Sequence, residues 1–82
     1  MDKYFVFFLQ NYVAEIVQMI IEKYNYEPMV ALKDFLNSET YKMLSNRELE
    51  MWEFGSLAIF DMWENEKLTG SVLNSAYLRN EN

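Results

Sequence analysis

Paired carboxylates are the side chains in this sequence with the types and spacing that chemistry would need. Asp61 and Glu64 are three residues apart, and Glu50 and Glu53 repeat that spacing, so each pair would share one face of a helix. Such pairs bind Mg²⁺ or Ca²⁺ or perform acid–base work, but they also need a pocket and further oxygen ligands. We interpret both pairs as a solvated acidic face, with a carboxylate-based metal-binding protein or enzyme as the alternative.

The residue types that most catalytic and metal sites use are absent from this sequence. It contains no histidine and no cysteine, which excludes Cys–His and Ser–His nucleophiles and every metal site built from those ligands. The two glycines, Gly55 and Gly70, stand fifteen positions apart and form no phosphate-binding loop. We predict that the protein is not an enzyme and that it holds no cofactor and no metal.

The segment from Glu48 to Glu66 is the most distinctive part of the chain, because it holds both tryptophans and six carboxylates but no basic residue. Its tryptophans, Trp52 and Trp63, either belong to the core or anchor a binding surface with an acidic rim. Periodicity favours a mixture of the two, with Trp63 facing inward and the carboxylates outside. The candidate interaction residues of the whole chain are Tyr4, Phe7, Trp52, Glu53, Asp61, Trp63 and Glu64.

Composition and charge restrict the class of protein and of partner. The 82 residues predict one domain, 1–82, and a hydrophobic fraction of 51% is high enough to build a core rather than a disordered chain. A net charge of −6 disfavours direct binding to the phosphate backbone of nucleic acid and is compatible with a basic protein partner. The absence of cysteine fits a reducing cytoplasm, where we expect the protein to be located.

The apolar start of the chain resembles neither a complete signal peptide nor a membrane span. The run Tyr4–Leu9 is six residues long, and no small-residue cleavage site follows it. Glu15 and Glu22 interrupt its continuation, whereas a spanning helix needs roughly 20 mostly apolar residues. We therefore expect a soluble protein without a membrane segment.

A long amphipathic helix is predicted from about Asp2 to Tyr24, with short β-strand formation at residues 4–9 as the alternative. Extending its polar stripe towards the N-terminus places Tyr4 and Phe7 on it, where a lone soluble helix would carry polar residues. These two aromatic side chains therefore need a cover. It is either another part of the chain, such as the C-terminal residues, or a second copy or partner protein.

The remaining signals predict an all-α bundle of three to five helices. Pro28 starts a second helix that stops near Asn37, and Ser38 caps a third. The pattern from Ser45 to Glu48 matches a capping box that opens the distinctive segment as a helix. Gly55-Ser56 marks either a break or a kink in this helix, and we favour a break. A further helix is predicted over residues 57–68, ending at Gly70. Residues 71–82 are predicted to form a partly flexible tail. The long first helix is expected to pack across the helices formed by residues 48–68.

The segment from Thr40 to Gly70 resembles the C-terminal part of small uncharacterised acidic helical bacterial proteins, in which an aromatic-acidic motif follows a helical N-terminal half. Some of those proteins are encoded beside toxin-like genes. The resemblance implies an antitoxin-like or accessory role and carries over no functional residues.

Together these observations predict a non-enzymatic protein-interaction module that buries an acidic-rimmed aromatic surface against itself, as a homodimer, or against a basic protein. A structural subunit of a homo-oligomer is the alternative of a different class.

Overall fold

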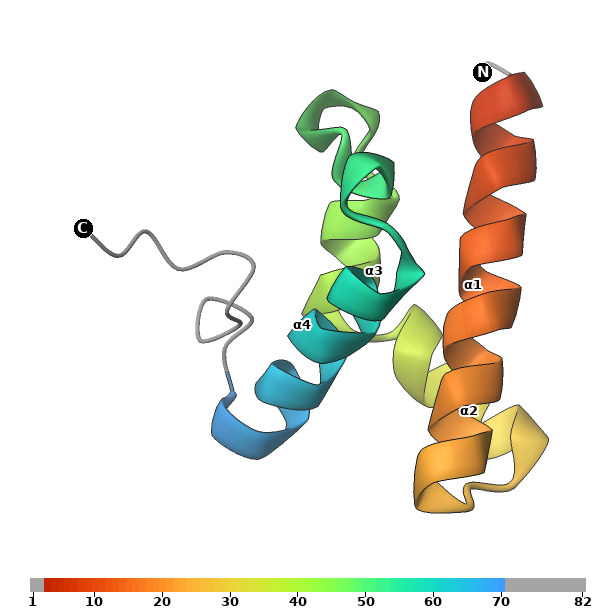
Figure 1. The fold of residues 1–82 in the computed structure, drawn as a ribbon, viewed down its shortest axis with the longest axis vertical. Coiled ribbons are helices and arrows are strands. Elements are labelled where there is room, and N and C mark those ends of the chain that lie inside the picture. The colour runs from red at the N-terminus through yellow and green to blue at the C-terminus, as the bar shows by residue number, and fades with distance from the viewer. Residues whose placement is uncertain (1–2, 71–82) are drawn as a thin grey trace.

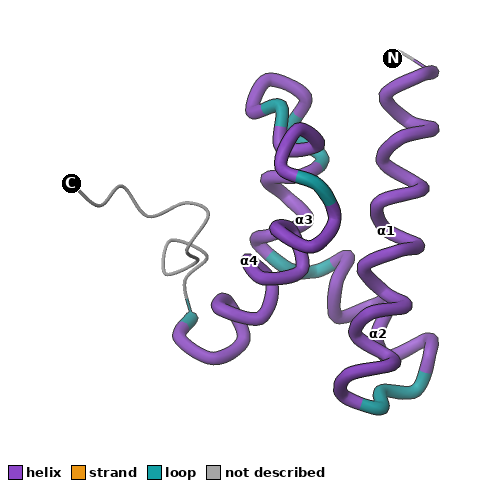
Figure 2. The backbone as a smooth tube through the Cα atoms, viewed as in Figure 1, coloured by secondary structure: helices purple, strands orange, loops and turns teal. Residues whose placement is uncertain are grey.

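The computed structural model describes residues 3–70, and within them the chain is all-α (Figure 2). It has four α-helices and two short 3-10 turns: α1 Lys3–Tyr24, α2 Pro28–Leu36, α3 Glu39–Leu44, η1 Arg47–Leu49, η2 Met51–Phe54 and α4 Ser56–Thr69. The predicted fold class, a small helical bundle with a long N-terminal helix, is confirmed. Residues 4–9 belong to α1, so the strand alternative is wrong.

The helices form a thin, two-layered molecule (Figure 1). Its principal dimensions are 37 × 33 × 18 Å, and 18 Å is about the thickness of two packed helices. α1 stands on one side and packs against both α2 and α4, which confirms that it crosses the Glu48–Leu68 region. A helix at the edge of so thin a molecule has only one face available to the core.

The core lies where α1, α2 and α4 meet. Ile16 and Ile20 of α1 and Phe35 of α2 are fully buried, and Trp63 of α4 is 2% exposed. Spacings of three and four residues place such side chains on one face of each helix, as predicted for α1 and α2. The other buried apolar side chains of the described residues are Ala31, Leu44, Met51, Ala58, Ile59, Phe60 and Met62.

The boundaries of α2 and the start of α3 follow the predicted signals. Pro28 is the first residue of α2, where its missing N–H costs no hydrogen bond, and the Glu27 carboxylate accepts from the Val30 N–H at 3.0 Å. α2 ends at Leu36, and Ser38 caps α3 by accepting from the Tyr41 N–H at 3.0 Å. Both boundary predictions are confirmed.

The predicted capping box is wrong. Ser45 donates to the Lys42 carbonyl at 3.2 Å, and Asn46, in place of Ser45, accepts from the Glu48 N–H at 3.1 Å. Asn46 therefore caps a single 3-10 turn, and Glu50 then adopts the left-handed conformation, φ 50°, between η1 and η2. An L-residue with positive φ ends a helix, so residues 47–54 form two tight turns in place of the expected helix.

Gly55 breaks the chain between η2 and α4, as predicted. Its φ of 84° and ψ of 163° lie in a region that is nearly exclusive to glycine. The break places Trp52 and Trp63 on different elements. Gly70 ends α4 in the left-handed conformation, which confirms the predicted cap. The predicted tail, 71–82, lies outside the described residues.

A carboxylate of α4 holds the start of α3, which is only six residues long. Glu66 accepts from the backbone N–H groups of Glu39 and Thr40, both at 2.9 Å, and from the buried Thr40 hydroxyl at 2.8 Å. Together with Ser38, it satisfies N–H groups that have no partner within the helix. α3 is therefore anchored by a tertiary contact.

Candidate interaction surface

The carboxylate pair Asp61 and Glu64 takes part in contacts that hold the fold together. Glu64 accepts from Lys23 Nζ at 2.5 Å and from the Tyr24 hydroxyl, and its side chain is 15% exposed. Asp61 is half-buried, and its carboxylate accepts from Asn65 Nδ2 at 3.3 Å. Among residues 3–70 no three His, Cys, Asp or Glu side chains gather as a metal site requires. Glu64 therefore connects α4 to the C-terminal end of α1.

Trp63 lies in the core and is only 2% exposed. Its ring contacts those of Tyr24, Tyr26 and Phe60 at centroid distances of 5.9–6.2 Å. The amine of Lys67 lies over the indole at 5.9 Å, where it also pairs with Asp34 at 3.0 Å. No hydrogen-bond partner for the Trp63 indole N–H is present within the described part of the chain. Shape and aromatic contact therefore fix this side chain.

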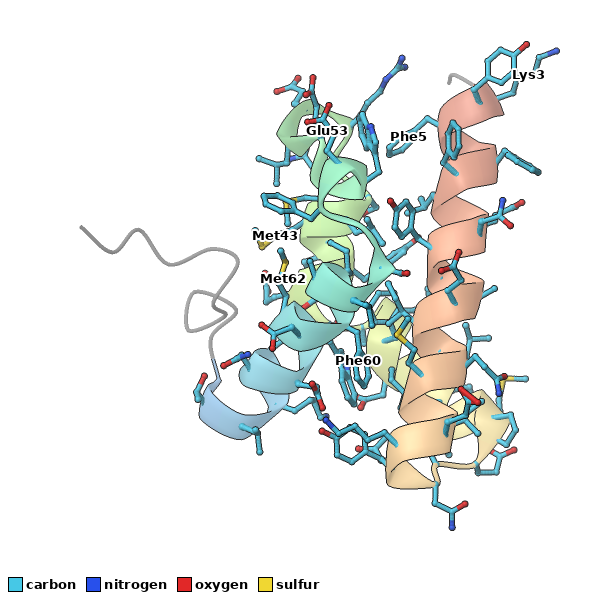
Figure 3. The ribbon with its side chains drawn as sticks, viewed as in Figure 1. Lys3, Phe5, Met43, Glu53, Phe60 and Met62 are labelled. Atoms are coloured by element: carbon cyan, nitrogen blue, oxygen red, sulfur yellow. The ribbon has the colours of Figure 1, made fainter. Side chains whose placement is uncertain are left out.

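Trp52 lies at the opposite end of the molecule, beside the first turns of α1. Its ring meets that of Phe5 edge-to-face at 5.4 Å, and its carbonyl accepts a hydrogen bond from the Tyr12 hydroxyl. Figure 3 shows Phe5 reaching from α1 towards this region, with Glu53 at the same end. Tyr4 and Phe8 line a small hollow with Trp52. We call Tyr4, Phe5, Phe8, Trp52 and Glu53 the aromatic end.

Three aromatic side chains on the first two turns of α1 remain exposed. The exposed fractions are 69% for Tyr4, 62% for Phe7 and 55% for Phe8. The sequence indicated that Tyr4 and Phe7 need a cover, and both side chains are still more than 60% exposed within residues 3–70. The structure thus joins Tyr4, Trp52 and Glu53 at one end and leaves Phe7 on a neighbouring face of α1. Asp61, Trp63 and Glu64 lie away from them, at the other end.

An apolar groove of about 740 Å³ runs between α1 and α2. Among residues 3–70, no charged side chain lines it. Its lining residues are Val6, Leu9, Gln10, Val13, Ala14, Val17, Gln18, Pro28, Met29, Leu32, Leu36 and Tyr41. Because Met29 and Leu36 are 54% and 39% exposed, the walls as well as the floor present apolar surface to solvent.

Sequence reasoning missed the groove and Phe8. The signal was present in α1, whose apolar residues Val6, Val13 and Val17 lie beside Ile16 and Ile20 around the helix. That apolar stripe is wider than one core-facing contact needs. The core of this thin molecule buries only part of that stripe.

α1 is also long and apolar enough, by length and composition alone, to cross a membrane. In the fold it packs through Ile16 and Ile20, and polar contacts in its middle and at its C-terminal end tie it to α4. The Ser56 hydroxyl donates to Glu15 at 2.8 Å, and Lys23 pairs with Glu64. These contacts favour a packed helix with one apolar face left over.

Contacts between helices raise the pKa of four groups. The Glu64 carboxylate, with burial second, raises the pKa of Tyr24 above 10.0 and, through its hydrogen bond, that of Lys23 above 10.5. The hydrogen bond to Asp34 raises the pKa of Lys67 above 10.5. Burial, with a smaller contribution from Glu15, raises the pKa of Tyr12. In each case the fold favours the protonated form.

We therefore predict a loss of stability at alkaline pH. A raised pKa adds stability that is present below the unfolded-state pKa and is lost as pH rises through the folded-state pKa. For these groups that window begins near pH 10. The urea midpoint, followed by circular dichroism, should be similar at pH 8 and 9 and should fall between pH 10 and 12. Tyr24→Phe should reduce the fall, and an equal fall in that variant would contradict the assignment.

No protein-family model, curated protein or solved structure matches this chain, so the candidate surface rests on its own geometry.

Proposed function

We propose that this protein is a non-enzymatic protein-interaction module and that its aromatic end binds a basic protein. The observation that carries the proposal is the exposed pair Tyr4 and Phe8 beside the half-buried Trp52. Exposed aromatic side chains beside a partly buried tryptophan are typical of the anchor residues of interfaces. An antitoxin-like or accessory role is one form that such an activity would take.

Charge supports a basic partner. Glu48, Glu50 and Glu53 are all exposed on or beside the 3-10 turns at this end, and the chain as a whole carries a net charge of −6. One basic side chain, Arg47, is also at this end, where its guanidinium carbon lies 6.0 Å from the centre of the Phe5 ring. Acidic groups around an apolar anchor accelerate the encounter with a positively charged surface and select against acidic proteins.

The test is affinity purification of the full chain from its native cell, followed by binding measurements with the purified captured protein. We expect a basic protein whose affinity falls about tenfold or more in Tyr4→Ala, because an anchor is worth roughly 2 kcal/mol. Glu53→Lys should lower the association rate, and the effect should shrink at high salt.

Two matched variants separate this surface from general effects. Leu57→Ala removes an apolar side chain that is 71% exposed on α4, and Glu39→Lys makes the same charge reversal on α3. Neither should change the affinity. Equal losses in the control and test variants, or capture that Tyr4→Ala leaves unchanged, would exclude the aromatic end as the binding site.

A further inference from the structure

We propose that the hollow at the aromatic end is an aromatic cage for one arginine side chain of the basic partner, which replaces Arg47 over the rings. This inference rests on the proposed function, because it names the side chain through which the basic partner binds. Three observations carry it: the arrangement of the rings, the cation that already lies among them, and the carboxylates beside them.

Four aromatic rings from two parts of the chain form the walls of the hollow. Tyr4, Phe5 and Phe8 come from the first two turns of α1, and Trp52 comes from η2. The rings of Phe5 and Trp52 meet at 70°, so they form two walls of a corner. The hollow has a volume of about 160 Å³, whereas small-molecule pockets have roughly 300–1,000 Å³, so it fits a single side chain.

Contacts between α1 and η2 hold this corner in place. The Tyr12 hydroxyl donates a hydrogen bond to the Trp52 carbonyl, and the Trp52 ring is half-buried against Phe5. Gly55 then ends η2 with a φ of 84° and leads the chain into α4. Walls that are fixed before binding lose little conformational entropy when a ligand arrives, which favours binding.

A cation of the chain itself already lies among the rings. Arg47 lines the hollow, and its guanidinium carbon is 6.0 Å from the centre of the Phe5 ring. At about this distance a cation is attracted to the face of an aromatic ring. A planar guanidinium also stacks on such rings, which the compact ammonium of lysine does not do. The hollow therefore suits a guanidinium, and a partner's arginine has to displace Arg47 to occupy it.

Two other cations of this chain show which groups accompany such a contact. Lys67 lies 5.9 Å from the centre of the Trp63 ring and pairs with Asp34 at 3.0 Å. Lys23 also lies over aromatic rings, and it pairs with Glu64 at 2.5 Å. In both places a ring and a carboxylate hold the cation together.

The aromatic end offers the same combination. Glu48 and Glu53 are exposed, and they directly follow Arg47 and Trp52 in the chain. Figure 3 shows Glu53 at the end of the molecule towards which Phe5 points. Negative charge beside the rings attracts a cation and disfavours an acidic side chain. Rings and carboxylates together therefore favour a cationic side chain over a neutral one.

Titration of the full chain with two blocked tripeptides, followed by NMR, tests the proposal. One carries arginine between two glycines, and the other carries norleucine, which is uncharged, in its place. The arginine peptide should shift the Trp52 indole resonance saturably. The norleucine peptide should bind about two- to fivefold more weakly, which is the usual value of a cation over an exposed ring. Equal binding of the two peptides, or no saturable shift, would overturn the proposal.

Removing Arg47 tests whether the ligand takes its place. Arg47→Met leaves the rings without an internal competitor, so the arginine peptide should bind about two- to fivefold more tightly. Lys33→Met removes the same charge from an exposed position on α2, away from the hollow, and should leave the affinity unchanged. Unchanged or weaker binding in Arg47→Met would show that the peptide does not displace this side chain, and would overturn the cage.

The rings are tested in the Arg47→Met chain, where no internal cation competes. Phe5→Leu keeps an apolar side chain and removes the ring, so the arginine peptide should bind about two- to fivefold more weakly. Because Phe5 is half-buried, the same change at the exposed Phe8 repeats the test at a position with less influence on folding. Phe54→Leu, at a ring that is 44% exposed outside the hollow, is the matched control. Equal affinities in all three variants would overturn the cage.

The cage and the proposed function fail separately. A captured basic protein that loses affinity in Tyr4→Ala, together with an arginine peptide that does not bind, would exclude the cage alone. An arginine peptide that binds in the hollow, together with no captured basic protein, would support the cage and count against the proposed function.

Discussion

Replacing Trp63 with alanine is expected to lower the free energy of unfolding by about 3–5 kcal/mol, the usual cost of deleting a large buried aromatic side chain. Trp63 is 2% exposed and contacts three other aromatic rings, so its removal leaves a cavity between α1 and α4. A domain of 82 residues has a total stability of about 4–12 kcal/mol. Urea unfolding followed by circular dichroism should therefore show a much lower unfolding midpoint for the variant, which at the lower end of that stability range is close to unfolding without urea.

The same deletion at Trp52 provides the matched control. Trp52 is half-buried and contacts Phe5 at one edge of the molecule, so Trp52→Ala should cost less than half as much. Trp63→Phe keeps a ring in the core and removes the indole N–H, and it too should cost far less than alanine. Equal losses at the two tryptophans would contradict the unequal burial on which the core is built.

Replacing Glu66 with alanine is expected to cost about 2–3 kcal/mol, a large effect for a side chain that is only half-buried. The carboxylate receives two backbone N–H groups and the hydroxyl of the fully buried Thr40. Removing it leaves the hydroxyl without a partner and frees the first turn of α3. Hydrogen exchange should show faster exchange at the Glu39 and Thr40 amides, and urea unfolding should give the free-energy loss.

Glu39→Ala is the control for this prediction. Glu39 pairs with Lys42 at 3.2 Å, but both side chains are more than 60% exposed, so its loss should cost less than about 0.5 kcal/mol. A comparable loss in the two variants would show that Glu66 contributes no more than an exposed ion pair.

Most helix boundaries could be predicted from the sequence because local chemistry determines them. Pro28, Ser38 and Gly70 act within one turn of their own position, through a missing N–H, a side-chain cap and a glycine with positive φ. The 3-10 turns were missed because Asn46 competed with Ser45 for the same cap, and neighbouring caps differ little in free energy. Glu50 then adopts a left-handed conformation that its residue type does not signal.

The candidate surface was harder to predict, because exposure depends on how many layers cover a helix. Tyr4 and Phe7 were identified by their misplacement on a polar stripe, which is a property of one helix. Asp61 and Glu64 could not be placed in the same way. The partners of Glu64, Lys23 and Tyr24, are about 40 positions away in the chain, and only the packing of α4 on α1 brings Glu64 to them.

The break at Gly55 gives the chain two native fluorophores in unlike surroundings. Trp63 sits among aromatic rings, so its emission wavelength should change only when the core opens. Trp52 borders Tyr4 and Phe8, so its emission wavelength should change when a partner binds at the N-terminal end of α1. A variant keeping Trp63 alone therefore reports folding, and one keeping Trp52 alone reports occupancy, each without an added dye.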